Sequence, residues 1–161
     1  MIPAHFILNN ATNLQSFQQS DSNLQIGNVS QFINAKNLTC LGGYFRNCYN
    51  MTSLDIYDIV LPNNCNDISG MFNNCSNLQG NLNIVGHNIE VDTGWFTFAN
   101  MQNLSSLKVS NMILKPGGMW GFAEYCNNLT SITLENVDTS NVSHFNYAFM
   151  GCKNLTTFNA N

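Results

Sequence analysis

The sequence predicts a repeat solenoid, a fold in which similar coils stack and each buries its apolar side against its neighbours. The first observation is a period of about 26 residues, because apolar anchor residues recur 27, 26, 25 and 26 positions apart. The second is that an asparagine directly precedes every anchor, and a Cys or Met stands three positions before it. The third is a short polar/apolar alternation after most anchors, which is typical of a strand with one buried face. The anchors are Met51, Leu78, Leu104, Leu129 and Leu155.

The segment before each anchor begins with an aromatic residue and is expected to form a short helical or 3₁₀ turn. Its Phe and Cys stand three residues apart, as Phe72 and Cys75 do. That spacing would place both side chains on one side of a single helical turn. The fourth unit departs from this pattern, because Phe122 lies one position early. The aromatic column contains Phe45, Phe72, Phe98, Phe122 and Phe149.

The segment after each anchor is expected to form a short strand on the opposite face of the coil. Residues 52–57, 106–109 and 131–134 alternate polar and apolar side chains with period two. Stacking such strands in parallel, about 4.8 Å apart, would give one buried apolar stripe and one outward polar face. The stripe is expected to contain Leu54, Leu82, Leu107, Ile132 and Phe158.

The asparagine column has a physical cause in the turn between the two segments. An asparagine side chain donates and accepts, so it can bond the turn of its own coil and that of the next. Compositional bias is the alternative, and it explains the total of 29 asparagines but not their place before every anchor. The same strings create N-glycosylation sequons, which we interpret as a by-product of the repeat, with glycosylation as the alternative.

Four of the six cysteines share one column with Met101. A position that accepts Cys or Met is expected to hold a compact apolar filler with a free thiol, although disulfides are the alternative. Cys40 and Cys65 lie outside the column, and no histidine is near enough in sequence to suggest zinc. The column cysteines are Cys48, Cys75, Cys126 and Cys152.

The domain organisation is expected to be simple. Residues 1–36 fit the repeat poorly and are interpreted as an N-terminal cap, because terminal coils are usually atypical. Residues 37–161 are expected to form a single domain of about five coils. The chain stops just after the last predicted strand, so its open end is expected to contact a partner or to continue into further chain.

Composition excludes several functions. Only 9 % of residues are charged, against about 25 % in typical domains. Five Lys and Arg residues cannot form the basic stripe that nucleic acid requires. No stretch of about 18 apolar residues exists, so no membrane insertion is expected. The start lacks a basic region and predicts no signal peptide, so the chain was trimmed or leaves the cell by another route, for example in a virus particle.

The repeat resembles the BspA-like leucine-rich repeats of bacterial surface proteins, a lipoprotein-type repeat of similar length. Residues 136–143 (Asn-Val-Asp-Thr-Ser-Asn-Val-Ser) and 148–155 (Ala-Phe-Met-Gly-Cys-Lys-Asn-Leu) carry the resemblance best, and it extends over residues 37–161. The chain departs from the pattern at Phe122 and at the extra residues Gly80 and Asn81. The resemblance implies leucine-rich-repeat-like coils that bind ligands or adhere outside cells, without catalytic residues or cofactor. It also implies a possible phage origin, because such repeats occur in phage proteins.

The titratable residues predict no enzyme, metal or cofactor. His5, His87 and His144 fall in different columns of the repeat, where a lone histidine is usually a surface residue. Asp55 and Asp58 could form a carboxylate pair, but a solvated strand edge is the favoured interpretation. A β-solenoid polysaccharide-active enzyme is the enzymatic alternative, and it would need a cluster of acids on one face.

The outward side chains of the predicted strands form a nearly neutral surface that can make many hydrogen bonds, and we interpret it as a binding face for protein or carbohydrate. Trp95 and Trp120 would be an alternative binding site if they were exposed, but we favour the interpretation that both are core residues. The predicted binding face contains Ser53, Asp55, Tyr57, Asn83, Lys108, Thr133, Glu135 and Asn159.

The leading functional hypothesis is therefore a non-catalytic recognition or adhesion module on an exterior surface, with a protein or glycan as its partner. The alternative is a structural virion component, such as a capsid decoration or tail-associated protein, that contacts other virion proteins through its open C-terminal end. A wall anchor in a longer parent gene would favour the first, and the presence of this chain in purified particles would favour the second.

Overall fold

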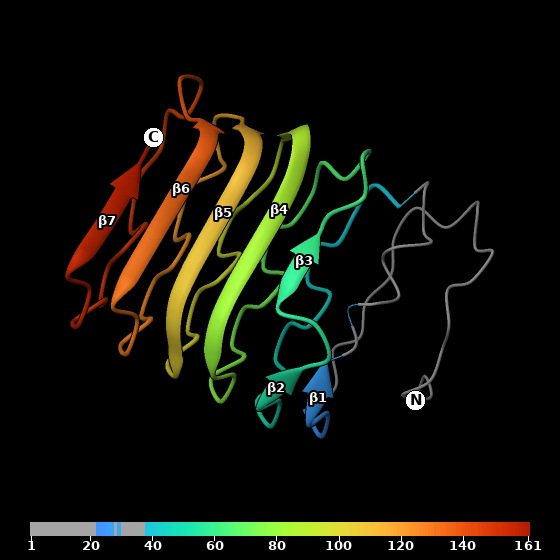
Figure 1. Ribbon diagram of the computed structural model, residues 1–161, viewed down its shortest axis with the longest axis vertical. Helices are drawn as coiled ribbons and strands as arrows, with labels where there is room; N and C mark the ends of the chain where they lie inside the picture. Colours follow the sequence, from blue (N-terminus) through green and yellow to red (C-terminus); the bar gives the residue numbers. More distant parts are fainter. Residues whose placement is uncertain (1–21, 28, 30–37) are drawn as a thin grey trace.

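The computed structural model describes residues 22–27, 29 and 38–161, and it shows a parallel β-solenoid (Figure 1). The predicted solenoid is therefore confirmed. The described strands form a two-stranded sheet, β1–β2, and a five-stranded sheet in the order β3-β4-β5-β6-β7, with every pair parallel. The strands are β1 (Ile26–Gly27), β2 (Ser53–Leu54), β3 (Asp58–Val60), β4 (Gly80–Val91), β5 (Leu104–Leu114), β6 (Ser131–Asp138) and β7 (Thr157–Ala160).

The predicted apolar stripe is present in the five-stranded sheet, with one exception. Leu82, Leu107, Ile132 and Phe158 are register partners on successive strands. The register shifts between Gly80 and Asn81, where Ser105 of β5 has no partner on β4. Leu54 is buried but pairs with Gly27 in the two-stranded sheet, so it does not join the stripe. A second stripe lies beside the first and contains Ile59, Ile84, Val109, Leu134 and Ala160.

The predicted helical segments are wrong, because no helix occurs among the described residues. The Cys48 N–H donates to the Phe45 carbonyl at 3.1 Å, as the three-residue spacing suggested, but the Phe45 N–H donates to Met71 of the next coil at 2.8 Å. Alternate amides thus bond between coils instead of within a helix. Asn47 and Asn74 have φ values of 64°, and such left-handed residues interrupt a right-handed helix.

The displaced phenylalanine of the fourth unit has a structural explanation. The Phe72 N–H bonds the carbonyl of Thr97, the residue before Phe98, and the Phe98 N–H bonds the carbonyl of Phe122. In both cases the accepting carbonyl belongs to the residue before the column position. Ala123, which follows Phe122, therefore occupies in the fourth coil the backbone position that Phe72 and Phe98 occupy in theirs. The Phe122 ring nevertheless packs edge-on against Phe98, with ring centroids 5.0 Å apart.

A row of aromatic rings forms the centre of the core. Phe45 and Phe72 have ring centroids 5.4 Å apart, and those of Phe72 and Phe98 are 6.1 Å apart. All these rings are buried, and so are the predicted anchors except Leu155, which is half-buried in the last coil. The repeat period therefore corresponds to one continuous core along the solenoid, in which each coil packs on its neighbours.

All six cysteines are free thiols, as predicted. The column position is more than an apolar filler, however, because three of its thiols donate to carbonyls of the preceding coil. Cys75 Sγ lies 3.1 Å from the Phe45 oxygen, and Cys126 Sγ lies 3.0 Å from the Phe98 oxygen. Cys152 Sγ makes the equivalent bond to Ala123 at 3.0 Å. Burial raises the pKa of Cys126 to about 12.

Thiol labelling checks this arrangement. Unfolding without reductant should expose all six thiols to an aromatic disulfide reagent at pH 8, because none is oxidised. In the native protein the four buried thiols should react far more slowly, because burial limits access to all four and raises the pKa of Cys65, Cys75 and Cys126. Fewer than six reactive thiols after unfolding would contradict the free-thiol arrangement. The buried thiols belong to Cys48, Cys65, Cys75 and Cys126.

The predicted N-terminal cap, residues 1–36, lies mostly outside the described residues. Of its described part, Ile26 and Gly27 pair with Ser53 and Leu54, so this segment adds a parallel strand to the solenoid. Across the described ranges, no helix has the length and apolar character required to cross a membrane.

Candidate functional site

A row of polar residues crosses the whole five-stranded sheet. The residues are direct register partners, one on each of the strands β3 to β7. In β4 the flanking Leu82 and Ile84 are buried while Asn83 is partly exposed, so strand alternation turns the row outward. We call this set the polar row, and it consists of Asp58, Asn83, Lys108, Thr133 and Asn159.

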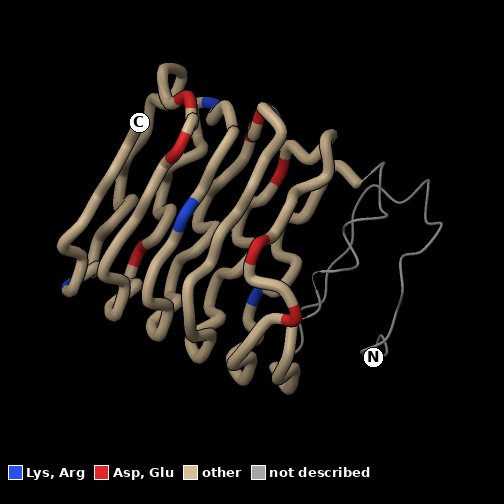
Figure 2. Tube along the Cα trace, in the orientation of Figure 1, with Lys and Arg blue, Asp and Glu red and all other residues tan. Residues whose placement is uncertain are grey.

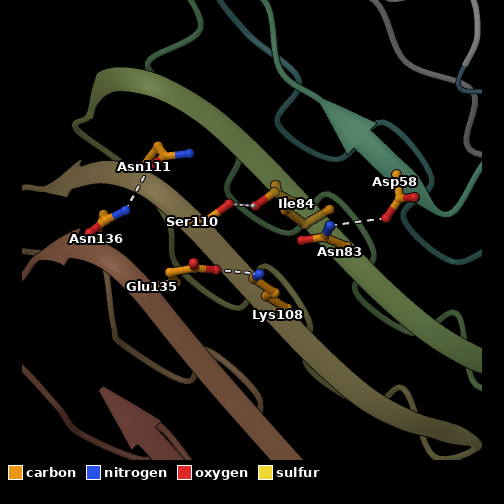
Figure 3. Close-up of polar contacts among 8 residues, drawn as sticks. All are labelled: Asp58, Asn83, Ile84, Lys108, Ser110, Asn111, Glu135 and Asn136. Atoms are coloured by element: carbon orange, nitrogen blue, oxygen red, sulfur yellow. Dashed lines mark hydrogen bonds and ion pairs between the residues drawn. The ribbon is translucent and has the colours of Figure 1, made fainter. Parts of the chain in front are cut away.

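Side-chain contacts link several members of the polar row to their neighbours (Figure 3). Asn83 Nδ2 donates to Asp58 Oδ1 at 2.9 Å, and Lys108 forms an ion pair with Glu135. The Oδ1 atom of Asn83 is buried and has no hydrogen-bond partner among the described residues. Asn83 and Lys108 are direct register partners on β4 and β5.

Two further rows widen the polar surface. On one side, Ser106 Oγ donates to Asn81 Oδ1 at 2.8 Å, and Ser131 continues that row in β6. On the other side, Asn136 Nδ2 donates to Asn111 Oδ1 at 3.3 Å (Figure 3). Asn111 and Asn136 have φ values of 56° and 51°. Asparagine tolerates this left-handed conformation, which bends β5 and β6 at the same level.

Charges are sparse on this surface. Figure 2 shows isolated acidic and basic residues along the coils and no continuous basic stripe. Lys108 is paired with Glu135, and Lys115 lies 3.0 Å from Glu90. A surface with paired charges and many neutral hydrogen-bonding groups suits a weakly charged ligand better than a polyanion.

The structure gathers five of the eight predicted face residues. Asn83, Lys108, Thr133 and Asn159 belong to the polar row, and Glu135 lies beside it. The other three lie elsewhere because the predicted strand over 52–57 is broken, with β2 ending at Leu54 and β3 beginning at Asp58.

The three remaining predicted residues have structural surroundings of their own. Ser53 lies in the two-stranded sheet. Asp55 accepts hydrogen bonds from the backbone amides of Val29 at 2.7 Å and Ile56 at 2.9 Å, which fixes a turn. Tyr57 is half-buried and lies over Gly80.

Asp58, which heads the polar row, was not part of the predicted face. The sequence contained a signal for it, because the row members Asp58, Asn83, Lys108 and Thr133 stand 25 residues apart. Counting back 25 residues from Asn83, the spacing of the later row members, finds Asp58, whereas the strand prediction pointed to Tyr57.

The favoured core assignment of the two tryptophans is wrong. Trp95 is 48 % exposed and Trp120 is 37 % exposed. The Trp95 indole lies against Gly117, where a Cβ atom would come within 1.9 Å of its Nε1. Both residues follow the ends of long strands, outside the buried stripes.

The titratable residues are dispersed. No group of three or more His, Cys, Asp or Glu side chains that could hold a metal occurs in the part of the chain that the structure describes. His87 and His144 are exposed, and His5 lies outside the described residues.

Asp67 is a partly buried carboxylate that accepts hydrogen bonds from several side chains. Partial burial works to raise its pKa, but hydrogen bonds from Ser69, Thr93 and Cys40 outweigh this effect and hold the pKa below its ordinary value. The Ser69 hydroxyl and amide donate to it at 2.7 and 2.9 Å. Asp67 also bridges to Cys40 and Thr93 of the adjacent coils, so it stabilises a turn.

The fold and the site together define a parallel β-solenoid with a polar outer strand face. No protein-family model matches the chain, and no curated protein or solved structure matches it either.

Proposed function

We propose that this chain is a non-catalytic recognition or adhesion module that acts on an exterior surface, with the polar row and its flanking residues as the contact surface. The observation that carries the proposal is the row itself, in which polar side chains on five parallel strands stand in register. The BspA-like resemblance of residues 136–155 supports exterior display.

The geometry of the polar row favours recognition of an extended partner. Parallel strands hold neighbouring side chains about 4.8 Å apart, so hydrogen-bonding groups recur at a fixed interval along the solenoid. Contacts such as that between Asn83 and Asp58 orient the side chains before binding, which lowers the entropy cost of association. A protein or glycan with a repeated, weakly charged polar surface fits this array.

The double variant Lys108→Ala/Thr133→Ala tests the proposal. Both residues belong to the polar row and lie on adjacent strands β5 and β6. The double variant should bind about tenfold more weakly than the parent to those ligands, on an array of glycans and purified extracellular proteins, that a Trp120→Ala protein still binds. Its midpoint of thermal unfolding should change little, because both side chains are partly exposed.

Lys153→Ala/Thr139→Ala is the matched control, since it removes the same residue types outside the five-stranded sheet. It should bind the array as the parent does. Equal binding by the parent and the polar-row variant would place the contact surface elsewhere. A parent protein that binds no member of the array would also count against the proposal.

A further inference from the structure

An exposed stack of aromatic rings lies outside the polar row. It contains one ring from each of three successive coils, in the segments that follow β4, β5 and β6. The ring centroids of Trp95 and Trp120 are 6.3 Å apart, and those of Trp120 and His144 are 6.0 Å apart. These separations are typical of interacting aromatic pairs. We call Trp95, Trp120 and His144 the aromatic ladder.

Glycines hold the aromatic ladder in place. Trp95 lies so close to Gly117 that any side chain there would displace the indole. A Cβ atom at Gly94 would lie 2.7 Å from the Gly118 oxygen, so the backbones of adjacent coils also approach closely here. The Trp95 indole therefore packs against backbone. A ligand that contacts it would lose little free energy to ordering of this side chain on binding.

The exposure of both tryptophans is unusual for a chain with so large a core. Exposed tryptophan forfeits hydrophobic stabilisation that burial would give, about 25 cal/mol for each Å² of apolar surface. Contiguous exposed aromatic surface with polar neighbours marks interaction sites. Trp95 and Trp120 adjoin each other on successive coils, so they form one surface and not two isolated exposed residues.

The charges around the aromatic ladder favour a neutral ligand. The ammonium of Lys115, two residues before Gly117, is engaged by Glu90 at 3.0 Å. Asp92, three residues before Trp95, is exposed and accepts from Asn66 Nδ2 at 3.2 Å. A stacked nucleobase would bring phosphate into acidic surroundings without an unpaired cation, which is unfavourable.

The polar groups beside the rings suit hydroxyl groups. Ser143 Oγ and His144 Nδ1 are 2.7 Å apart, and together they offer a donor and an acceptor at one end of the aromatic ladder. The Asn66–Asp92 pair offers amide and carboxylate groups at the corner that leads into Trp95. Apolar rings flanked by such groups match a pyranose, which has an apolar C–H face and a rim of hydroxyls.

We propose that the aromatic ladder binds a neutral oligosaccharide whose sugar rings follow one another along the solenoid axis, across Trp95, Trp120 and His144. This site is separate from the polar row, so it names a ligand class and a location that the proposed function does not require. The two surfaces are tested by different variants.

Tryptophan fluorescence reports on this site directly, because Trp95 and Trp120 are the only two tryptophans of the chain. Cellohexaose, xylohexaose and chitohexaose serve as probes, with isothermal titration calorimetry as a second readout. At least one probe should change the emission saturably and release or absorb heat. Trp120→Ala and Trp120→Phe should weaken that binding, the alanine variant by about tenfold or more. Trp95 remains in both variants, so its emission reports on binding in each.

Two controls separate this proposal from a general loss of fold and from the polar row. Tyr49→Ala removes another exposed aromatic residue and should leave sugar affinity within about twofold. The polar-row variant Lys108→Ala/Thr133→Ala should likewise retain the sugar affinity of the parent. The proposal is overturned if no probe binds, if Trp120→Ala binds as the parent does, or if oligothymidylate binds at this site in preference to the sugars.

Discussion

Phe98→Ala is expected to lower the free energy of unfolding by about 3–5 kcal/mol. Phe98 is fully buried and lies in the middle of the aromatic row, with ring centroids 6.1 Å from Phe72 and 5.0 Å from Phe122. Truncation removes apolar burial and leaves a cavity that the neighbouring coils cannot fill. Because each coil of a solenoid is stabilised by its neighbours, one truncation here weakens two coil interfaces.

Urea denaturation followed by circular dichroism measures this effect. Phe158→Ala is the control, because Phe158 is also a stripe residue but lies on the edge strand β7 and is 47 % exposed. It should cost about 1 kcal/mol or less. Similar losses for Phe98→Ala and Phe158→Ala would show that the aromatic row is not the principal core.

Gly121→Ala is expected to destabilise the protein by about 2–5 kcal/mol, from left-handed strain and steric overlap together. Gly121 has a φ of 58°, and a Cβ atom there would lie 2.4 Å from the Phe96 ring. The ring belongs to the preceding coil and must shift to make room for the added Cβ atom.

Gly70→Ala separates the two contributions. Gly70 has nearly the same φ of 59°, but its added Cβ would meet only Asn73 Cβ, at 3.6 Å. It should therefore show the strain alone, about 1–2 kcal/mol. In a Phe96→Ala background the cost of Gly121→Ala should fall towards that of Gly70→Ala. A cost that does not depend on Phe96 would refute the steric explanation.

The period of the sequence was sufficient to predict the stacking and much of the register. Leu82, Leu107, Ile132 and Phe158 align as expected because strand alternation and the repeat length agree with each other. The same agreement places Asn83, Lys108, Thr133 and Asn159 of the candidate site in one row. In these strands the alternation within each strand and the period between strands predict the same register.

The helical turns could not be excluded from spacing alone. Phe72 and Cys75 do make a three-residue hydrogen-bonded turn, and a 3₁₀ helix has the same spacing. What differs is that alternate amides, those of Phe72 and Asn74, bond to the next coil, and that Asn74 has a left-handed conformation. A sequence window within one coil does not contain that partner.

The two tryptophans of the aromatic ladder remained only an alternative site in the sequence for a related reason. A tryptophan with apolar neighbours is more often buried, whereas Trp95 here lies over Gly117 of the next coil. The pairing recurs where Phe96 lies over Gly121 and Tyr125 lies over Gly151. A glycine 22 to 26 residues after an aromatic residue is therefore a readable signal, but only once the coils are known to stack.

Nuclear Overhauser spectroscopy of isotope-labelled protein tests the stacking most directly, because it detects short distances between backbone protons of adjacent strands. The in-register solenoid predicts contacts between residues one period apart, such as Asn83 with Lys108 and Lys108 with Thr133. Absence of these contacts, with the local medium-range pattern of a helix over Phe72 to Cys75, would contradict the stacked arrangement on which both proposed surfaces depend.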